Sequence, residues 1–106
     1  MKITAIIPTL NEEERIQNSL KSAAFADEII VIDSYSTDRT VELVKKSGAI
    51  LLQRKFDDFS SQKNYAIDHA SYDWIIWIDA DEVLTTELQE EIKRAIVNTK
   101  DFVGFY

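Results

Sequence analysis

The sequence contains no cysteine and only two glycines among its 106 residues. Without cysteine, the chain can form no disulfide, no thiolate metal site and no cysteine nucleophile. Neither a Gly-x-Gly-x-x-Gly pattern nor a Walker-type loop follows the first apolar run, which argues against dinucleotide and P-loop chemistry. The single histidine, His69, is predicted to lie on a helix remote from the strand ends. A Ser-His-Asp triad is therefore not expected.

Long apolar runs and a positive net charge are also missing. No apolar run approaches the roughly 18–20 residues of a membrane-spanning helix, and the run at residues 3–7 is too short for a secretory signal. The 19 acidic residues against 12 basic ones give a net charge of −7, and an acidic chain repels the phosphate backbone of nucleic acids. Because 45% of the residues are hydrophobic, we expect one folded domain. The acidic charge argues against a nucleic-acid partner, and we expect a cytoplasmic location.

Apolar runs of strand length alternate along the chain with segments of helical period. The predicted strands cover residues 3–7, 28–32, 49–52, 74–78 and 102–106. Helices are expected after N-caps at Asn11, at Ser36 or Thr37, and at Thr86, with a further helix over residues 60–70. Gly48 is expected to end the second helix. This order predicts an α/β fold, in which a mostly parallel sheet lies between two layers of helices.

Acidic residues follow two of the predicted strands, and Pro8 is predicted to end the first strand and begin a loop. In open parallel sheets, ligands bind beyond the carboxyl ends of the strands. Asp33, after the second strand, can accept a hydrogen bond from a nucleobase imide or a ribose hydroxyl. Asp79 and Asp81, after the fourth, could share Mg²⁺ or Mn²⁺, which prefer oxygen ligands. The alternative for this pair is a solvated turn that charges the start of the next helix.

Other charged residues near the strand ends have ordinary explanations as well. The run from Glu12 to Glu14 suits the first turn of a helix, although one of these side chains could face a ligand. The positive charges of Arg54, Lys55 and Lys63 could neutralise a diphosphate, although such residues more commonly form a solvated basic surface.

Four segments of the chain carry motifs that form a set. In order, they are Ile7-Pro8-Thr9-Leu10-Asn11-Glu12-Glu13, Ile30-Val31-Ile32-Asp33-Ser34-Tyr35-Ser36-Thr37-Asp38-Arg39-Thr40, Phe59-Ser60-Ser61-Gln62-Lys63-Asn64-Tyr65-Ala66 and Ile78-Asp79-Ala80-Asp81-Glu82. Together they resemble the family 2 glycosyltransferases, and the motif residues are most similar to those of the lipopolysaccharide-core β-glucosyltransferase branch. The second motif of that family often reads Asp-Asp-Gly-Ser-x-Asp, whereas this chain has Asp33-Ser34-Tyr35 in the first three places.

The resemblance implies a GT-A fold, a Rossmann-like sheet that binds a nucleotide-diphospho-sugar. By position in the motifs, it implies substrate contacts at Pro8, Glu12, Asp33, Lys63 and Asp79. Asp33 would contact the uracil, Glu12 would lie beside the nucleoside, and Asp79 would meet the ribose or sugar. Asp81 would hold the Mg²⁺ or Mn²⁺ that bridges the diphosphate and stabilises the departing UDP. The implied partners are a UDP-sugar donor and a saccharide or lipid-linked saccharide acceptor.

The resemblance also relates this chain to a longer enzyme. Residues 1–106 correspond to the N-terminal, nucleotide-diphospho-sugar-binding part of a catalytic domain, so we expect a sheet truncated at its C-terminus. The acceptor site and the carboxylate base of inverting members are expected beyond residue 106. We therefore expect a donor-binding fragment with little activity. Its cytoplasmic parent, peripheral at the inner membrane, would transfer a hexose in cell-envelope or lipopolysaccharide synthesis. An open sheet edge predicts self-association.

Two other functions suit the same pattern. A non-catalytic nucleotide-binding or interaction module could use the same fold and bind UDP without transferring a sugar. A phosphoacceptor domain of the receiver type also places acidic residues at parallel strand ends. That second alternative requires a lysine at a later strand end, and the sequence contains no such strand.

Overall fold

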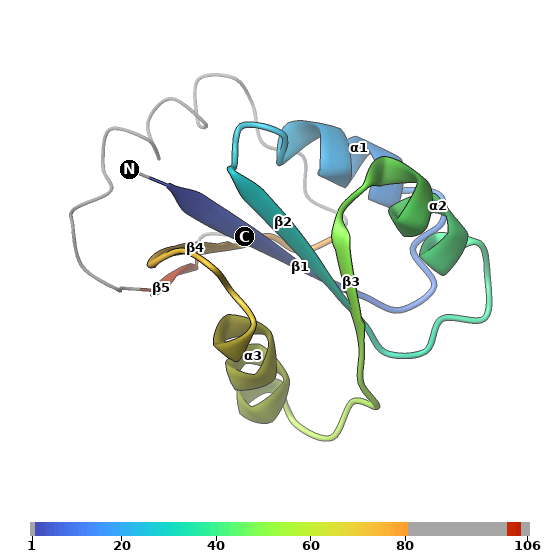
Figure 1. The fold of residues 1–106 in the computed structure, drawn as a ribbon. Helices are drawn as coiled ribbons and strands as arrows, with labels where there is room; N and C mark the ends of the chain where they lie inside the picture. Colours follow the sequence, from blue (N-terminus) through green and yellow to red (C-terminus); the bar gives the residue numbers. More distant parts are fainter. Residues whose placement is uncertain (1, 81–101, 105–106) are drawn as a thin grey trace.

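The computed structural model describes residues 2–80 and 102–104, and Figure 1 shows the path of the chain. The strands are β1 (Ile3–Thr9), β2 (Glu28–Asp33), β3 (Ile50–Gln53), β4 (Trp74–Trp77) and β5 (Phe102–Gly104). The helices are α1 (Ile16–Ser22), α2 (Thr40–Ser47) and α3 (Phe59–Asp68). All five predicted strands are therefore present, with shifted ends. The helix predicted to begin at Thr86 lies outside the described residues.

The strands form one sheet in the order β3-β2-β1-β4-β5, and every neighbouring pair is parallel. The chain builds outward from β1 to β3 and then crosses back to place β4 on the other side of β1. The strand order therefore reverses between β1 and β4. In open α/β sheets, ligands bind at such a reversal, beyond the carboxyl ends of the strands. The predicted parallel sheet is confirmed.

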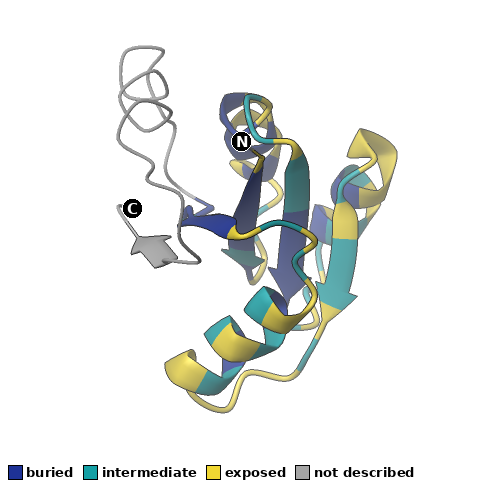
Figure 2. Cartoon of the chain, turned by 60° about the vertical axis from the view of Figure 1, so that its left-hand side comes forward, coloured by how far each residue is buried: buried dark blue, intermediate teal, exposed yellow. Residues whose placement is uncertain are grey.

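Helices cover both faces of the sheet, with α1 and α2 on one side and α3 on the other (Figure 1). Side chains alternate along a strand, so Trp74 packs into the core beneath α1 and α2, whereas Trp77 packs into the core beneath α3. The strands β1 and β4 are almost entirely buried (Figure 2). Burial on both faces explains why β4 is apolar throughout and why Thr4 and Thr9 are the only polar residues of β1. The predicted three-layer α/β/α sandwich is confirmed.

The first strand continues beyond its predicted end at Pro8. This proline is paired with β2, and β1 ends one residue later at Thr9. The Ile6 carbonyl accepts a hydrogen bond from Ile78 on the β4 side. In a parallel strand, the backbone N–H and C=O groups of successive residues point to opposite neighbouring strands. Pro8, two residues after Ile6, therefore faces the β4 side, where pairing has ended at Ile6. No ladder hydrogen bond is lost, and the prediction that Pro8 begins a loop is wrong.

The first two helices begin later than the sequence predicts. They follow Arg15 and Arg39, whose side chains make no capping hydrogen bond. The predicted caps bind each other across two loops instead. The Asn11 side chain accepts from the Thr37 N–H at 2.8 Å, and the Asn11 N–H donates to Ser36 Oγ at 2.8 Å. Asparagine and serine favour N-caps because their oxygens accept from backbone N–H groups, and here they do so between loops.

The remaining helix ends follow local signals. Gly48 ends α2 as predicted, at a φ of 83° that glycine adopts without steric cost. Asp58 caps α3 by accepting from the Ser61 N–H at 2.7 Å. Among residues 2–80, no helix is long and apolar enough to cross a bilayer.

Candidate functional site at the carboxyl edge of the sheet

The loops that follow β1, β2 and β4 leave the sheet at its carboxyl edge (Figure 1). Those strands and loops carry four predicted site residues: Pro8, Glu12, Asp33 and Asp79. A fifth, Lys63, comes from α3, and its Nζ lies 5.8 Å from the ring centre of Trp77, the last residue of β4. The structure therefore brings the five predicted substrate-binding residues to one edge. The predicted metal ligand, Asp81, lies outside the described residues.

Asp33 is a fully buried carboxylate with neutral partners. Its exposed fraction is 0%. Its two oxygens accept hydrogen bonds from Thr9 Oγ1 at 2.7 Å, from the N–H of Ser36 at 2.8 Å, from the Ser36 hydroxyl, and from Gln53 Nε2 at 3.4 Å. A buried carboxylate is stable only when hydrogen-bond donors replace the lost water. Asp33 therefore joins β1, β3 and the loop after β2.

This burial gives Asp33 a structural part in the site. Direct contact between its carboxylate and a nucleobase stays a prediction, because a ligand N–H must first replace one of the four donors. The bond from Gln53, at 3.4 Å, is longer than the usual range for an N–H donor to oxygen. Gln53 is therefore the donor that a ligand would displace most easily.

Two loops at this edge are joined by backbone-to-side-chain hydrogen bonds. Three consecutive N–H groups after β1 donate to side chains after β2: Asn11 to Ser36 at 2.8 Å, Glu12 to Thr40 at 2.8 Å, and Glu13 to Asp38 at 3.1 Å. Each of these donors lies before the first turn of α1, where no intrahelical partner exists. The loop after β2 and the first residue of α2 therefore supply the acceptors for these three N–H groups.

The three glutamates after β1 differ in exposure. Glu13 and Glu14 are exposed, whereas the Glu12 side chain is only 23% exposed. Arg15 lies 3.5 Å from the Glu12 carboxylate, at the long end of hydrogen-bond range, and is itself largely exposed. The structure therefore singles out Glu12 as the glutamate that is held at the sheet edge.

Both loops contain a residue in the left-handed backbone region. Asn11 has a φ of 53° and Tyr35 a φ of 60°. For residues other than glycine, this conformation costs roughly 1–2 kcal/mol, less for asparagine. The hydrogen bonds of Asn11 and of Asp33 fix the turns in which they lie. Tyr35 stands where the related motif often has glycine, which needs no such support.

A second hydrogen-bonded group lies between β3 and α3. Arg54 makes a bidentate ion pair with Asp57, at 2.7 and 3.0 Å, and its Nη1 lies 3.3 Å from Gln62 Oε1. Because the guanidinium only donates, it turns the amide oxygen of the buried Gln62 toward itself. The Gln62 amino group then donates to Ser34 Oγ at 3.1 Å. These contacts join α3 to the end of β2.

We expect Asp57 to titrate far below an ordinary aspartate. The side-chain hydrogen bonds from Arg54, followed by the Asp58 N–H, lower the pKa of Asp57 from 3.8 to about 2. Because the native pKa is the lower one, the ion pair stabilises the fold above about pH 4 and loses that effect as pH falls through 2. In Arg54→Gln, an NMR titration of the carboxyl carbon should show the pKa raised toward 3.8, although the Asp58 N–H still lowers it. A pKa still near 2 would mean that the Asp58 N–H controls it.

The end of β4 and the residues that follow it are held from both faces of the sheet. On one face, the buried Ser19 hydroxyl of α1 donates to the Ala80 carbonyl. On the other face, the rings of Phe59 and Trp77 lie 5.5 Å apart, and Lys63 Nζ lies 5.4 Å from the Phe59 ring centre, within cation–π range. These contacts position the peptide that carries Asp79. Ser19 was not predicted, because a mid-helix serine gives no local signal.

Large apolar side chains are exposed around the same edge. This apolar rim consists of Leu10, Tyr35, Phe56 and Phe59, each between 53% and 57% exposed. They lie after β1, β2 and β3 and at the start of α3. Aromatic rings at such an edge can stack on flat ligands.

The described residues hold only part of the predicted metal site. Within residues 2–80 and 102–104, no group of three or more His, Cys, Asp or Glu side chains is arranged to hold a metal ion. Asp79, which is half-buried, lies in this part of the chain, and its predicted partner Asp81 does not. Any cation at this edge therefore needs ligands beyond those described, such as the oxygens of a bound diphosphate.

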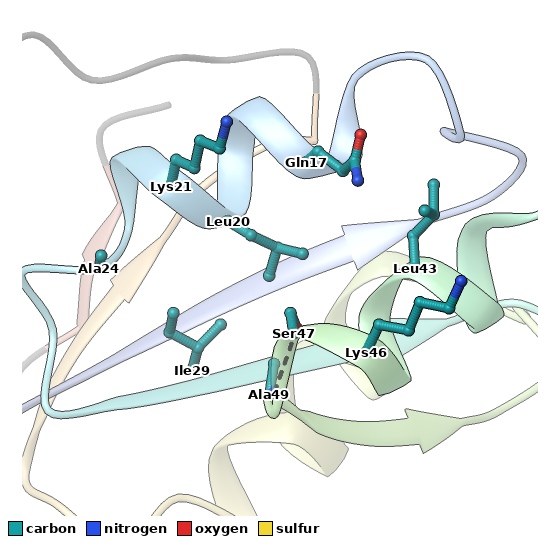
Figure 3. Close-up of a pocket in the computed structure, with 9 residues that line it drawn as sticks. All are labelled: Gln17, Leu20, Lys21, Ala24, Ile29, Leu43, Lys46, Ser47 and Ala49. Carbon is teal, nitrogen blue, oxygen red and sulfur yellow. Dashed lines mark hydrogen bonds between the residues drawn. The ribbon is translucent and has the colours of Figure 1, made fainter.

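A groove of about 390 Å³ lies away from this edge, between α1 and α2 (Figure 3). Its apolar lining includes Leu20, Ile29 and Leu43, and Lys21 and Lys46 extend from the two helices beside it. The groove contains none of the predicted site residues. The candidate site is therefore the carboxyl edge and not this groove.

Comparison with known proteins places the chain in a family. The sequence model of Glycosyl transferase family 2 matches residues 4–105. An uncharacterized glycosyltransferase of Rickettsia bellii is 44% identical over 93 residues, which cover 87% of this chain and 32% of the relative. The chain therefore spans about a third of the length of that relative.

Two solved structures show the same arrangement of strands and helices. S. aureus TarS in complex with UDP matches with a TM-score of 0.70 and 27% identity, covering 89% of this chain and 31% of TarS. Glucosyl-3-phosphoglycerate synthase of Mycobacterium tuberculosis, in complex with Mn²⁺, UDP and glucosyl-3-phosphoglycerate, matches with a TM-score of 0.66 and 27% identity, covering 74% and 33%. The same synthase has been solved with Mg²⁺ and UDP.

The parallel sheet, its strand order and its acidic carboxyl edge define a Rossmann-like domain of the GT-A type. Within that class, the chain belongs to glycosyl transferase family 2.

Proposed function

We propose that this chain is the donor-binding part of an inverting glycosyltransferase that transfers a hexose from a UDP-sugar to a saccharide. The main observation behind the proposal is that four predicted site residues lie around the carboxyl edge: Glu12, Asp33, Lys63 and Asp79. Membership of family 2 supports sugar transfer. UDP in the related TarS and synthase structures supports the class of donor.

Each proposed contact has a chemical reason. The nucleoside lies between the loops after β1 and β2, where Pro8, Glu12 and Asp33 offer apolar surface and acceptors, and the apolar rim offers stacking surface. The Lys63 ammonium faces the diphosphate as a point charge. Asp79 accepts hydrogen bonds from hydroxyls of the ribose or the sugar.

The carboxylate ligands at the end of β4 fit a hard divalent cation. Asp79 and Asp81 offer carboxylate oxygens, which Mg²⁺ and Mn²⁺ prefer, and both ions accompany UDP in the related synthase. We propose that Asp81 holds the ion and that Asp79 lies beside it. When bound, such an ion supplies positive charge that stabilises the departing diphosphate. Lys63 adds positive charge to the site from the chain itself.

The location, pathway and acceptor of the parent enzyme are assigned only from the resemblance of the motif residues to the family. We propose that the parent enzyme works in the cytoplasm, peripheral at the inner membrane, and acts in cell-envelope or lipopolysaccharide synthesis on a saccharide or lipid-linked saccharide. The acceptor site and the general base are assigned to parts of the parent outside residues 1–106, because the chain covers only 32% of its Rickettsia relative. This chain alone is then expected to transfer little or no sugar. Self-association through a sheet edge stays a prediction.

Calorimetric titration with UDP tests the donor site. We expect UDP to bind in the presence of Mn²⁺, and its affinity to fall at least about tenfold, or 1.4 kcal/mol, in EDTA. GDP is the matched control ligand, because it carries the same diphosphate on a different base. Equal affinity in EDTA would contradict the metal assignment. No binding to a folded sample in either condition would contradict the donor site, and UDP binding without sugar transfer by the full-length parent would favour a non-catalytic module.

A further inference from the structure

Thr40, the first residue of α2, connects the two loops at the carboxyl edge. It is fully buried, and its hydroxyl is hydrogen-bonded to two groups. One is the carboxylate of Asp38, and the other is the backbone N–H of Glu12 at 2.8 Å. Because a carboxylate only accepts, the hydroxyl donates to Asp38. Its lone pair is thereby directed to the N–H of Glu12.

Asp38 is fixed by its own partners. Its carboxylate also accepts from the Thr40 N–H at 2.9 Å and from the Glu13 N–H at 3.1 Å. Desolvation acts to raise the pKa of Asp38, but the hydrogen bonds from Thr40 and Glu13 outweigh it and hold this pKa below the ordinary 3.8. The carboxylate therefore stays charged at neutral pH and keeps Thr40 in one orientation.

Glu12 is held on both sides of its Cα atom. Its N–H donates to Thr40, and its carbonyl accepts from the N–H groups of Arg15 at 3.0 Å and Ile16 at 2.8 Å. Fixing both peptide groups leaves only the side-chain torsions free. A side chain whose backbone is fixed before binding loses less freedom when it meets a ligand.

We propose that Thr40, oriented by Asp38, is a positioning residue that aims Glu12 at the donor. The inference rests on the proposed function, because it takes Glu12 as a group that contacts the nucleoside. Thr40 itself is fully buried and acts on the donor only through the backbone of Glu12.

Thr40→Val tests the inference, because it keeps the shape of the side chain and removes the hydroxyl. We expect the affinity for UDP with Mn²⁺ to fall about tenfold, since the loss of the hydroxyl removes the acceptor of the Glu12 N–H and misplaces Glu12. Thr40→Ser keeps the hydroxyl and should bind UDP within about twofold of the unaltered chain. Calorimetry gives the affinities, and thermal unfolding shows whether each variant is folded.

Thr4→Val is the matched control. Thr4 is also fully buried, and its hydroxyl donates to the carboxylate of Glu28 at 2.9 Å, at the opposite end of the sheet. Both substitutions remove one buried hydroxyl from a carboxylate, so both should lower stability. Only Thr40→Val should change the affinity for UDP. An equal loss in Thr4→Val would mean that general destabilisation, and not positioning, weakens binding.

A double-mutant cycle with Glu12→Ala separates positioning from a merely structural role. If Thr40 acts through the Glu12 carboxylate, Thr40→Val should have no further effect on UDP affinity once that carboxylate is removed. Effects that multiply would overturn the inference. If Glu12→Ala alone leaves UDP binding unchanged, the contact assigned to Glu12 is wrong and the inference falls with it. If the unaltered chain does not bind UDP at all, the proposed function fails first.

Discussion

Asp33→Asn should lower the free energy of unfolding by about 2–4 kcal/mol, a large part of the 5–15 kcal/mol that holds a domain together. The substitution keeps the shape of the side chain but replaces one accepting oxygen with an amino group. That amino group then faces donors among Thr9, Ser36 and Gln53. At least one buried donor loses its acceptor, at about 1–3 kcal/mol each. Urea unfolding followed by far-UV circular dichroism measures the difference.

Asp73→Asn is the control for this prediction. Asp73 is exposed and precedes β4, so the same chemical change there should alter stability by less than about 0.5 kcal/mol. Asp33→Asn should also weaken UDP binding, because Asp33 holds the loop after β2 on which the loop after β1 rests. If Asp33→Asn unfolds at the same urea concentration as the unaltered chain, the four hydrogen bonds do not stabilise the fold as argued.

The strands and their parallel pairing were predictable from burial and from the alternation with helices, whereas the order β3-β2-β1-β4-β5 was not predicted. A strand covered on two faces is mostly apolar, and the runs at residues 29–32 and 74–78 show this directly. Alternation with helical segments then predicts parallel pairing and right-handed crossovers. The same reasoning led to the carboxyl edge, where Asp33 and Asp79 follow buried strands. Loops that follow parallel strands must leave from one edge, whatever their sequence.

The helix starts could not be predicted from local signals alone. Asn11 and Ser36 have the chemistry of N-caps, but each can accept from any suitably placed N–H group. In the structure, those N–H groups belong to the neighbouring loop and not to the residue's own helix. A local rule does not distinguish an N–H of the residue's own helix from one of the neighbouring loop, because the partner in the loop lies 25 or 26 residues away in the sequence.

The supporting residues of the site were missed for a related reason. Ser19, Thr40 and Gln62 are buried polar residues on helices, and their partners come from other elements. Ser19 gives no local signal, and although Thr40 and Gln62 lie within motif segments, the motifs do not show what these side chains contact. Only the packing of α1, α2 and α3 against the sheet brings each side chain to an unsatisfied group. The motif resemblance identified the residues that would face a ligand, and the structure identifies those that hold them in place.

Asp81→Ala should abolish the dependence of UDP binding on Mn²⁺. A hard cation that loses one of its few protein carboxylates binds the site weakly, and the diphosphate then meets the acidic edge without compensating charge. We expect the affinity for UDP with Mn²⁺ to fall at least about tenfold and to match the affinity in EDTA. We expect the fold to be retained, and thermal unfolding of the variant checks this. Calorimetry in both conditions measures this.

Asp73→Ala is the matched variant for this experiment, because it removes the same charge from the opposite end of the same strand. Both substitutions change the net charge by one unit, so a general electrostatic effect on UDP should appear equally in both. A loss confined to Asp81→Ala assigns the effect to the carboxyl edge. If Asp81→Ala keeps the full Mn²⁺ dependence, the ion is held elsewhere, and Asp79 becomes the carboxylate to substitute next. If both variants lose affinity alike, net charge and not metal ligation controls UDP binding.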